Sequence, residues 1–238
     1  MPDSSSRPRR VRWLVAALAV AGIAVLAWGA LAPSQGPAPG GGRPTSEAGD
    51  PQAQKLKSLQ RRQPGDPYAL GRPDAPVVMI QYEDYRCPFC AQFSRQIQPE
   101  LLDRYVRSGT LRIEWRDMPI FGEQSTEVAE AARAAGRQGR FWQFHDAAYS
   151  VGDGNSKPDF GPGVIEDLAR RAGVPDMSRF DADRGDPAIA AEVARDRDEG
   201  QRLGVPSTPA FLIGGQAVLG AQPLPEFTAA IEQERANP

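Results

Sequence analysis

The sequence predicts an α/β domain that follows an apolar N-terminal segment and a linker. Short β-branched apolar runs alternate with longer segments of helical periodicity, which is the pattern of an α/β domain. With 40% apolar and 24% charged residues, the 238-residue chain can build a core, so collagen-like, fully disordered and multi-span membrane proteins are excluded. The formal net charge of −2 argues against a nucleic-acid partner.

The first 32 residues indicate a membrane signal. Residues 1–12 contain four arginines, and residues 13–32 carry no charge over a length that spans a hydrocarbon core of about 30 Å as a helix. We therefore expect a single-pass signal-anchor in the cell membrane, with residues 1–12 cytoplasmic and the rest of the chain extracytoplasmic. A cleaved signal peptide is the alternative, because Ala30-Leu31-Ala32 resembles a cleavage site, although Pro33 disfavours cleavage there.

Residues 33–66 are predicted to form a disordered linker. Six Pro and six Gly fall among them, and apolar residues are almost absent, so this stretch lacks the means to build a core. The folded domain is then expected at residues 67–238.

The first half of this domain predicts strand, helix and strand. The run V-V-M-I-Q-Y at 77–82 is β-branched, apolar and too short for an independent helix. Pro88 suits the first turn of a helix that extends to about residue 106. A second strand is expected at 111–115, parallel to the first because a helical crossover joins the two.

The second half predicts several helices, a hairpin and a closing helix. The hairpin is indicated by two short apolar runs that flank Gly214-Gly215-Gln216. The expected helices are 123–136, 140–150, 162–172, 187–203 and 225–234, and the expected hairpin strands are 210–213 and 217–219.

The two cysteines lie in Cys87-Pro88-Phe89-Cys90, between a predicted strand and a predicted helix. A spacing of three places both sulfurs on one helix face, close enough to bond. Cys87 falls near the N-cap, where free N–H groups and the helix dipole stabilise a thiolate, the nucleophilic form. Cys90 lies one turn further in and is the expected resolving thiol.

Other uses of this cysteine pair are less favoured. No second pair exists and His145 is the one histidine, so we expect no metal and no cofactor. Haem attachment would need a histidine at position 91, which is Ala91. A structural disulfide would close a very small loop and would therefore stabilise the fold little.

Several segments together resemble the DsbA-like thiol–disulfide oxidoreductases of the thioredoxin superfamily. The resemblance extends over about residues 67–238, and the Cys-Pro-Phe-Cys box followed by Ser-Thr-Pro is its most specific part. The segments are Leu70-Gly71 with Ala75-Pro76-Val77, then Y-E-D-Y-R-C-P-F-C at 82–90, F-W-Q-F-H-D at 141–146, V-P-S-T-P-A-F at 205–211 and Gly214-Gly215.

The resemblance implies a thioredoxin fold with a helical insertion at about 121–203. It also implies that Pro209 is cis and lies beside the cysteines, a point that the sequence alone leaves open, since cis X–Pro bonds are uncommon. Thr208 would then offer its backbone to an extended substrate strand. Pro209, which lacks an N–H, would help to keep metals off the sulfurs.

The chain departs from well-known members of this family at two positions. Phe89 stands where a histidine is common, so we expect a less strongly lowered pKa of Cys87 and a weaker oxidant. Gln81 stands where a buried acid is common, so Asp84, Glu83 or neither exchanges the proton of Cys90, with Asp84 preferred because it is closer to the cysteines in sequence.

Aromatic residues near the motif have two interpretations. Tyr82, Tyr85 and Phe89 are candidates to line an apolar groove for unfolded polypeptide, although core packing explains Tyr82 equally well. His145 lies in an aromatic segment and is expected to be structural.

The expected function is donation of the Cys87–Cys90 disulfide to exported polypeptides, with a membrane redox partner that reoxidises the pair. One alternative keeps the chemistry and reverses its direction, which gives a reductase or isomerase. The other is a non-catalytic anchored module that binds unfolded chains or one partner and holds only a structural disulfide.

Overall fold

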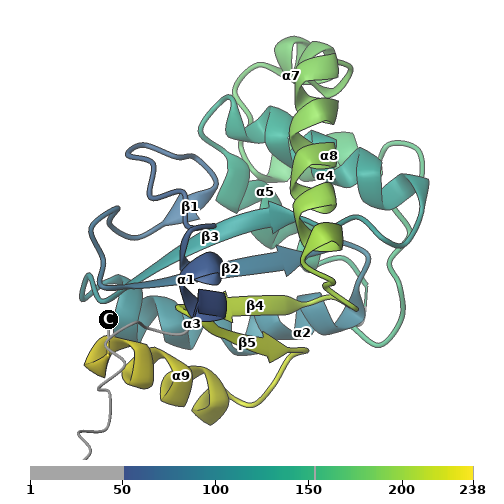
Figure 1. Cartoon of the computed structure of the whole chain (residues 1–238). Coiled ribbons are helices and arrows are strands. Elements are labelled where there is room, and N and C mark those ends of the chain that lie inside the picture. Colours follow the sequence, from purple (N-terminus) through teal and green to yellow (C-terminus); the bar gives the residue numbers. More distant parts are fainter. Residues whose placement is uncertain (1–50, 153, 238) are drawn as a thin grey trace, which may run out of the picture. The chain divides into compact units, whose positions relative to one another are not determined.

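A five-stranded sheet in the order β1-β3-β2-β4-β5 lies at the centre of the domain (Figure 1). The central strands β2 (Val77–Glu83) and β3 (Leu111–Asp117) are parallel. They are buried along their whole length, as expected for strands covered on both faces. The predicted hairpin is present as β4 (Ala210–Ile213) and β5 (Gln216–Leu219), and β4 pairs antiparallel with β2. The short edge strand β1 (Ala69–Leu70) was not predicted.

The computed structural model describes residues 51–152 and 154–237. The predicted basic segment, the signal-anchor and the first part of the linker, residues 1–50, lie outside these described residues. Within the described part of the chain, no helix combines the length and the apolar character needed to cross a lipid bilayer.

One face of the sheet is covered by α2 (Pro88–Gln96), α3 (Gln98–Leu101), a π-helical turn η1 (Leu102–Val106) and α9 (Leu224–Ala236). The rings of Phe93, Phe211 and Phe227 meet there, with centroids 4.4 to 5.2 Å apart. The single helix expected from 88 to 106 is interrupted near Ile97, because Pro99 has no N–H for a helical hydrogen bond and its ring crowds the preceding turn.

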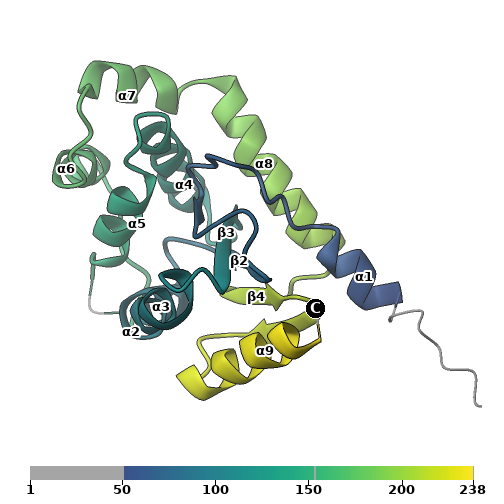
Figure 2. The ribbon, with the colours of Figure 1, turned by 90° about the vertical axis from the view of Figure 1, so that its left-hand side faces the viewer.

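The opposite face is covered partly by residues that the sequence assigned to the linker (Figure 2). Leu56 in α1 (Pro51–Lys57) and Leu59 pack on the sheet. The backbone N–H groups of Arg61 and Arg62 donate to the buried Glu114 carboxylate at 2.9 and 2.7 Å. The expectation of a disordered linker up to residue 66 is therefore wrong for residues 51–66, where contacts with the sheet replace the core that this segment lacks by itself.

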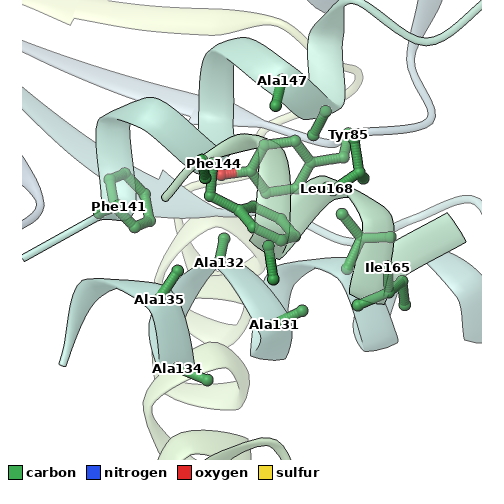
Figure 3. Close-up of a cluster of buried hydrophobic side chains, with 14 of the residues drawn as sticks. Tyr85, Ala131, Ala132, Ala134, Ala135, Phe141, Phe144, Ala147, Ile165 and Leu168 are labelled. Carbon is green, nitrogen blue, oxygen red and sulfur yellow. The ribbon is translucent and has the colours of Figure 1, made fainter. Parts of the chain in front are cut away.

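The helical insertion lies between β3 and β4, as the resemblance implied. Its packing centre includes Tyr85, Phe144 and Leu168, which come from different segments of the chain (Figure 3). The helices are α4 (Glu123–Gly136), α5 (Phe141–Tyr149), α6 (Val164–Arg171), α7 (Met177–Arg184) and α8 (Pro187–Arg202).

The helix α7 was missed in the sequence because Phe180 is the one apolar side chain that it buries. Its N-cap residue is Asp176, whose carboxylate accepts a hydrogen bond from the N–H of Arg179 at 2.9 Å.

A buried ionic cluster joins the insertion to the sheet. The Arg133 guanidinium on α4 donates to Asp117 at the end of β3 at 2.6 Å, and also to Asp196 on α8. All three side chains are at most 1% exposed. Because these charges are buried, they are compensated by one another and by neighbouring charged side chains. A shift of α4 or α8 would separate them, so the cluster fixes how the two helices pack on the sheet.

Candidate active site

Cys87 and Cys90 lie at the start of α2, directly after β2 and its loop. Cys87 is the N-cap residue, and its N–H donates to the carbonyl oxygen of Asp84 at 3.0 Å. Its own carbonyl accepts the N–H of Ala91 at 3.1 Å, which is the first helical hydrogen bond. The sulfurs are not bonded to each other. Cys87 is 2% exposed and Cys90 is fully buried, so access to the pair is narrow and leads to Cys87 first.

The two thiols titrate very differently. A hydrogen bond from the Cys90 thiol is the main cause that lowers the pKa of Cys87 to about 6, against the opposing effect of burial. Thr208 and the backbone N–H groups of Cys90 and Phe89 lower it further. Burial first, and then the hydrogen bond to Cys87, raise the pKa of Cys90 well above its ordinary value. At neutral pH this arrangement holds a thiolate at Cys87 beside a neutral thiol at Cys90.

This shift arises without a histidine inside the motif. Phe89 contributes its backbone N–H, while its side chain is 60% exposed. That the protein is a weaker oxidant than members with histidine at this position stays a prediction.

Pro209 lies next to the cysteines, as the resemblance implied. The Cys87 sulfur lies 3.2 Å from the carbonyl oxygen of Thr208, to which it can donate only in its protonated thiol form, although 121 positions separate these residues in the chain. The peptide bond between Thr208 and Pro209 is cis. Pairing of β4 with β2 causes this approach, because Ala210 is opposite Tyr82 and the residues before β4 therefore reach the loop that carries Cys87.

Two neighbouring acids at the end of β2 have different surroundings, because Glu83 is the last residue of the strand and Asp84 follows it. The Asp84 carboxylate accepts the backbone N–H groups of Arg86, Ile120 and Phe121 at 2.7 to 3.1 Å, so it braces the loop that follows β3. The Glu83 carboxyl is 1% exposed and accepts the hydroxyl of Tyr149 at 2.8 Å.

Of the two acids, Glu83 is the one whose charge interacts with those of Cys87 and Cys90. Burial, with the negative charge of Cys87 in addition, raises the pKa of Glu83 to about 8. The charge of Glu83 in turn contributes to the raised pKa of Cys90. The alternation of side chains along β2 could have identified Glu83 from the sequence. Glu83 lies on the same face as Met79 and Gln81, toward α2, whereas Asp84 lies beyond the end of the strand. Tyr149 had no such signal and was missed.

The expected aromatic groove is wrong for Tyr85, and for Tyr82 the alternative of core packing is confirmed. Tyr82 and Tyr85 are at most 1% exposed, and Tyr85 stacks on Trp115 with ring centroids 5.2 Å apart. Of these three aromatic side chains, only that of Phe89 is exposed to solvent. Arg86 fixes two loops beside it by donating to the carbonyl oxygens of Phe121 at 2.8 Å and Pro158 at 3.0 Å.

No group of three or more His, Cys, Asp or Glu side chains suited to a metal ion occurs in the residues that the structure describes. Gln81, at the position where related proteins often carry an acid, is buried on β2.

Comparison with known proteins agrees with this geometry. The family model described as Thioredoxin matches residues 63–233. The probable disulfide bond formation protein D of Bacillus cereus is 29% identical over 154 residues, which cover 62% of this chain and 69% of that protein. The oxidised BdbD of Bacillus subtilis has a similar structure, with a TM-score of 0.66, 23% identity and coverage of 71% of this chain and 93% of that one.

A further relative is a much longer protein. The Na(+)/H(+) antiporter NhaA 3 of Salinispora tropica is 31% identical over 173 residues, which are 71% of this chain but 25% of the antiporter. The likeness concerns one part of that protein only. The chain belongs to the thioredoxin family, in which it is a thiol–disulfide oxidoreductase with a DsbA-like fold.

Proposed function

We propose that this protein oxidises exported polypeptides by donating the Cys87–Cys90 disulfide. The observation that carries the proposal is the unequal ionisation of the two thiols, with Cys87 ionised at neutral pH and Cys90 protonated. A stable Cys87 thiolate favours the reduced pair, and a pair that is stabilised when reduced has a more oxidising disulfide.

The reaction begins when a substrate thiolate attacks the sulfur of Cys87. The Cys87–Cys90 bond breaks, and its electron pair leaves on Cys90. Glu83, whose burial favours the protonated carboxyl, supplies the proton that this buried thiolate requires. The result is a mixed disulfide between the substrate and Cys87, and a neutral Cys90.

A second substrate thiolate then attacks the substrate sulfur of the mixed disulfide. Cys87 leaves as a thiolate, which is a good leaving group because its pKa is about 6. The substrate gains a disulfide, and the protein gains two electrons. A membrane redox partner must accept these electrons to restore the Cys87–Cys90 bond.

The substrate is an extended segment of polypeptide beside the backbone of Thr208. The exposed ring of Phe89 offers it an apolar contact next to the reacting sulfur. Pro209, which has no N–H, and Pro88 flank the site as further supporting residues. We assign the domain to the extracytoplasmic side of the cell membrane, held by the signal-anchor expected at residues 13–32.

The direction of exchange is tested by the reduction potential of the full chain, measured by equilibration with glutathione. We expect a value well above the thioredoxin potential of about −270 mV. A value near that of thioredoxin would indicate a reductase or isomerase instead.

Two cysteine variants test the chemistry itself. Cys87→Ser should abolish exchange with a reduced polypeptide, while the matched Cys90→Ser should accumulate a mixed disulfide on Cys87. Exchange that survives in Cys87→Ser would leave the non-catalytic binding module as the better account.

A further inference from the structure

His145 is the only histidine of the chain, and it connects the protein interior with the surface. Its ring on α5 is fully buried, yet Nδ1 lies 2.9 Å from the carboxylate of Asp146, whose side chain is 74% exposed. Burial lowers the pKa of His145, so the ring is neutral at pH 7. A carboxylate only accepts hydrogen bonds, so Nδ1 carries the proton and Nε2 has a free lone pair.

Several buried polar atoms have no hydrogen-bond partner in the part of the chain that the structure describes, among them Nε1 of Trp142, and three of these atoms belong to side chains around Tyr149. These three are Nε2 of His145, Oε1 of Glu83 and the hydroxyl of Tyr85. All three side chains surround Tyr149. Its hydroxyl donates to Oε2 of Glu83, and its ring centroid lies 4.9 Å from that of His145 and 5.1 Å from that of Tyr85.

These three atoms have the chemistry of a binding site for one water molecule. Since Oε2 of protonated Glu83 accepts from Tyr149, its proton belongs on Oε1 and is available for donation. A water can accept from Oε1, donate to Nε2 of His145 and form a third bond with the Tyr85 hydroxyl. Buried water makes about three hydrogen bonds in proteins, and buried polar groups seldom stay unpaired.

We propose that His145 and Asp146 form the proton route between Glu83 and solvent, and that they act with Tyr85 and one bridging water. This inference rests on the proposed function, because it supplies the proton exchange that Cys90 needs. His145 is a positioning and relay residue that acts through Glu83 and touches no substrate.

The route accounts for the proton in both halves of the reaction. Before Cys90 can form a bond, Glu83 passes its proton through the water to Nε2, and the imidazole releases the Nδ1 proton toward Asp146. Glu83 then accepts the proton of Cys90. When Cys90 is later reduced, Glu83 returns that proton, and a new one enters at Nδ1 and leaves Nε2 inward. One proton out and one in restore the starting tautomer.

Electrostatic contacts link the two ends of this route. Burial raises the pKa of Tyr85, and the negative charges of Asp117, Glu83 and Asp146 add to this effect, so Tyr85 lies within electrostatic range of both Glu83 and Asp146. The titratable groups that face Glu83 and His145 are Cys87 and Cys90 of α2, Tyr85 of the loop after β2, and Asp146 and Tyr149 of α5.

The test follows the reduced full chain as oxidised glutathione reacts with it. Mixed-disulfide formation reports on Cys87, and release of glutathione reports on deprotonation of Cys90. In His145→Gln we expect the second step to slow at pH 7 by about 100-fold, the lower end of general acid–base effects, while the first step changes less than about 2-fold. The matched control Trp142→Phe alters a ring 5.0 Å from that of His145 and should leave both steps nearly unchanged.

Equal second-step rates in wild type and His145→Gln would overturn the route. Slowing of both steps, shared by Trp142→Phe, would show that His145 only packs. If His145→Gln does not fold, the surface variant Asp146→Asn must slow the second step selectively, and an unchanged rate there would also overturn the route. No reaction of the wild type with glutathione would instead refute the proposed function.

The tautomer of His145 can be measured without an exchange assay. Nitrogen-15 NMR of the single histidine at pH 7 should show Nδ1 protonated and Nε2 unprotonated. The opposite tautomer, or a ring protonated on both nitrogens, would contradict the assignment of Nε2 as the interior proton acceptor.

Discussion

Relative to the wild type, the Glu83→Gln variant should become more stable as the pH rises. The pKa of this carboxyl is raised from 4.5 to about 8, mainly by burial. The folded state therefore keeps a proton that the unfolded state has released, and the stability of the wild type falls between these two pH values. Glutamine resembles the protonated acid, accepts the same hydrogen bond from Tyr149 and does not titrate.

The size of the effect follows from the pKa difference. Each pH unit between the unfolded and folded pKa values costs the wild type about 1.4 kcal/mol. From pH 5 to pH 7, the free energy of unfolding of Glu83→Gln should therefore rise relative to wild type by roughly 2–3 kcal/mol, and the difference should level off above about pH 8.

Urea unfolding of both reduced proteins at pH 5, 6, 7 and 8 measures this difference. The matched control is Glu226→Gln at an exposed acid, which measures how much of the difference comes from loss of any carboxylate. A flat difference for Glu83→Gln would refute the reasoning, since it would mean that Glu83 ionises as easily in the fold as in the unfolded chain.

Two further substitutions test other parts of the structure. Cys90→Ala removes the hydrogen bond that most lowers the pKa of Cys87, so the midpoint of Cys87 alkylation should rise from about pH 6 by roughly one pH unit or more; an unchanged midpoint would assign the shift to the backbone N–H groups. Arg133→Met leaves Asp117 buried without a cation and Asp196 with Arg61 as its remaining close partner, and should cost about 3–5 kcal/mol in urea unfolding; a loss below about 1 kcal/mol would contradict a tightly coupled cluster.

The parts of the fold that the sequence predicted correctly have local causes. The apolar runs of β2 and β4, and the motif with a proline after Cys87, need only neighbouring residues to determine strand and helix. The same holds for the helix at 123–136, whose observed bounds agree with those expected.

The parts that were missed depend on distant contacts. The segment 51–66 has too few apolar residues to fold alone, and it is ordered because Leu56 and Leu59 meet the sheet and two arginine N–H groups meet Glu114. The amino-acid composition of a segment does not show which residues elsewhere in the chain will contact that segment in the fold.

The candidate site shows the same limit for its acids. Closeness in sequence favoured Asp84 over Glu83, but the side chains of a strand point alternately to opposite faces, so one position decides what a carboxyl meets. Glu83 is on the face toward α2, whereas the Asp84 carboxylate binds backbone N–H groups after β3. The raised pKa of Glu83 also requires the residues that bury it, whose arrangement is a property of the folded chain, and the hydrogen bond from Tyr149 opposes this effect of burial.

Glu83 responds to the redox state of the pair because the charge of Cys87 is one of the causes that raise its pKa. In the disulfide that charge is absent, so the pKa of Glu83 is lower than in the reduced pair. When a substrate breaks the disulfide, new negative charge on sulfur raises the affinity of Glu83 for protons at the moment when Cys90 also needs one. Proton uptake is thereby coupled to reduction, and proton release to reoxidation. A site with a buried thiol and a buried acid can then turn over only as fast as protons reach it from the surface, so the residues around His145 bear on the rate of exchange although they are remote from the substrate.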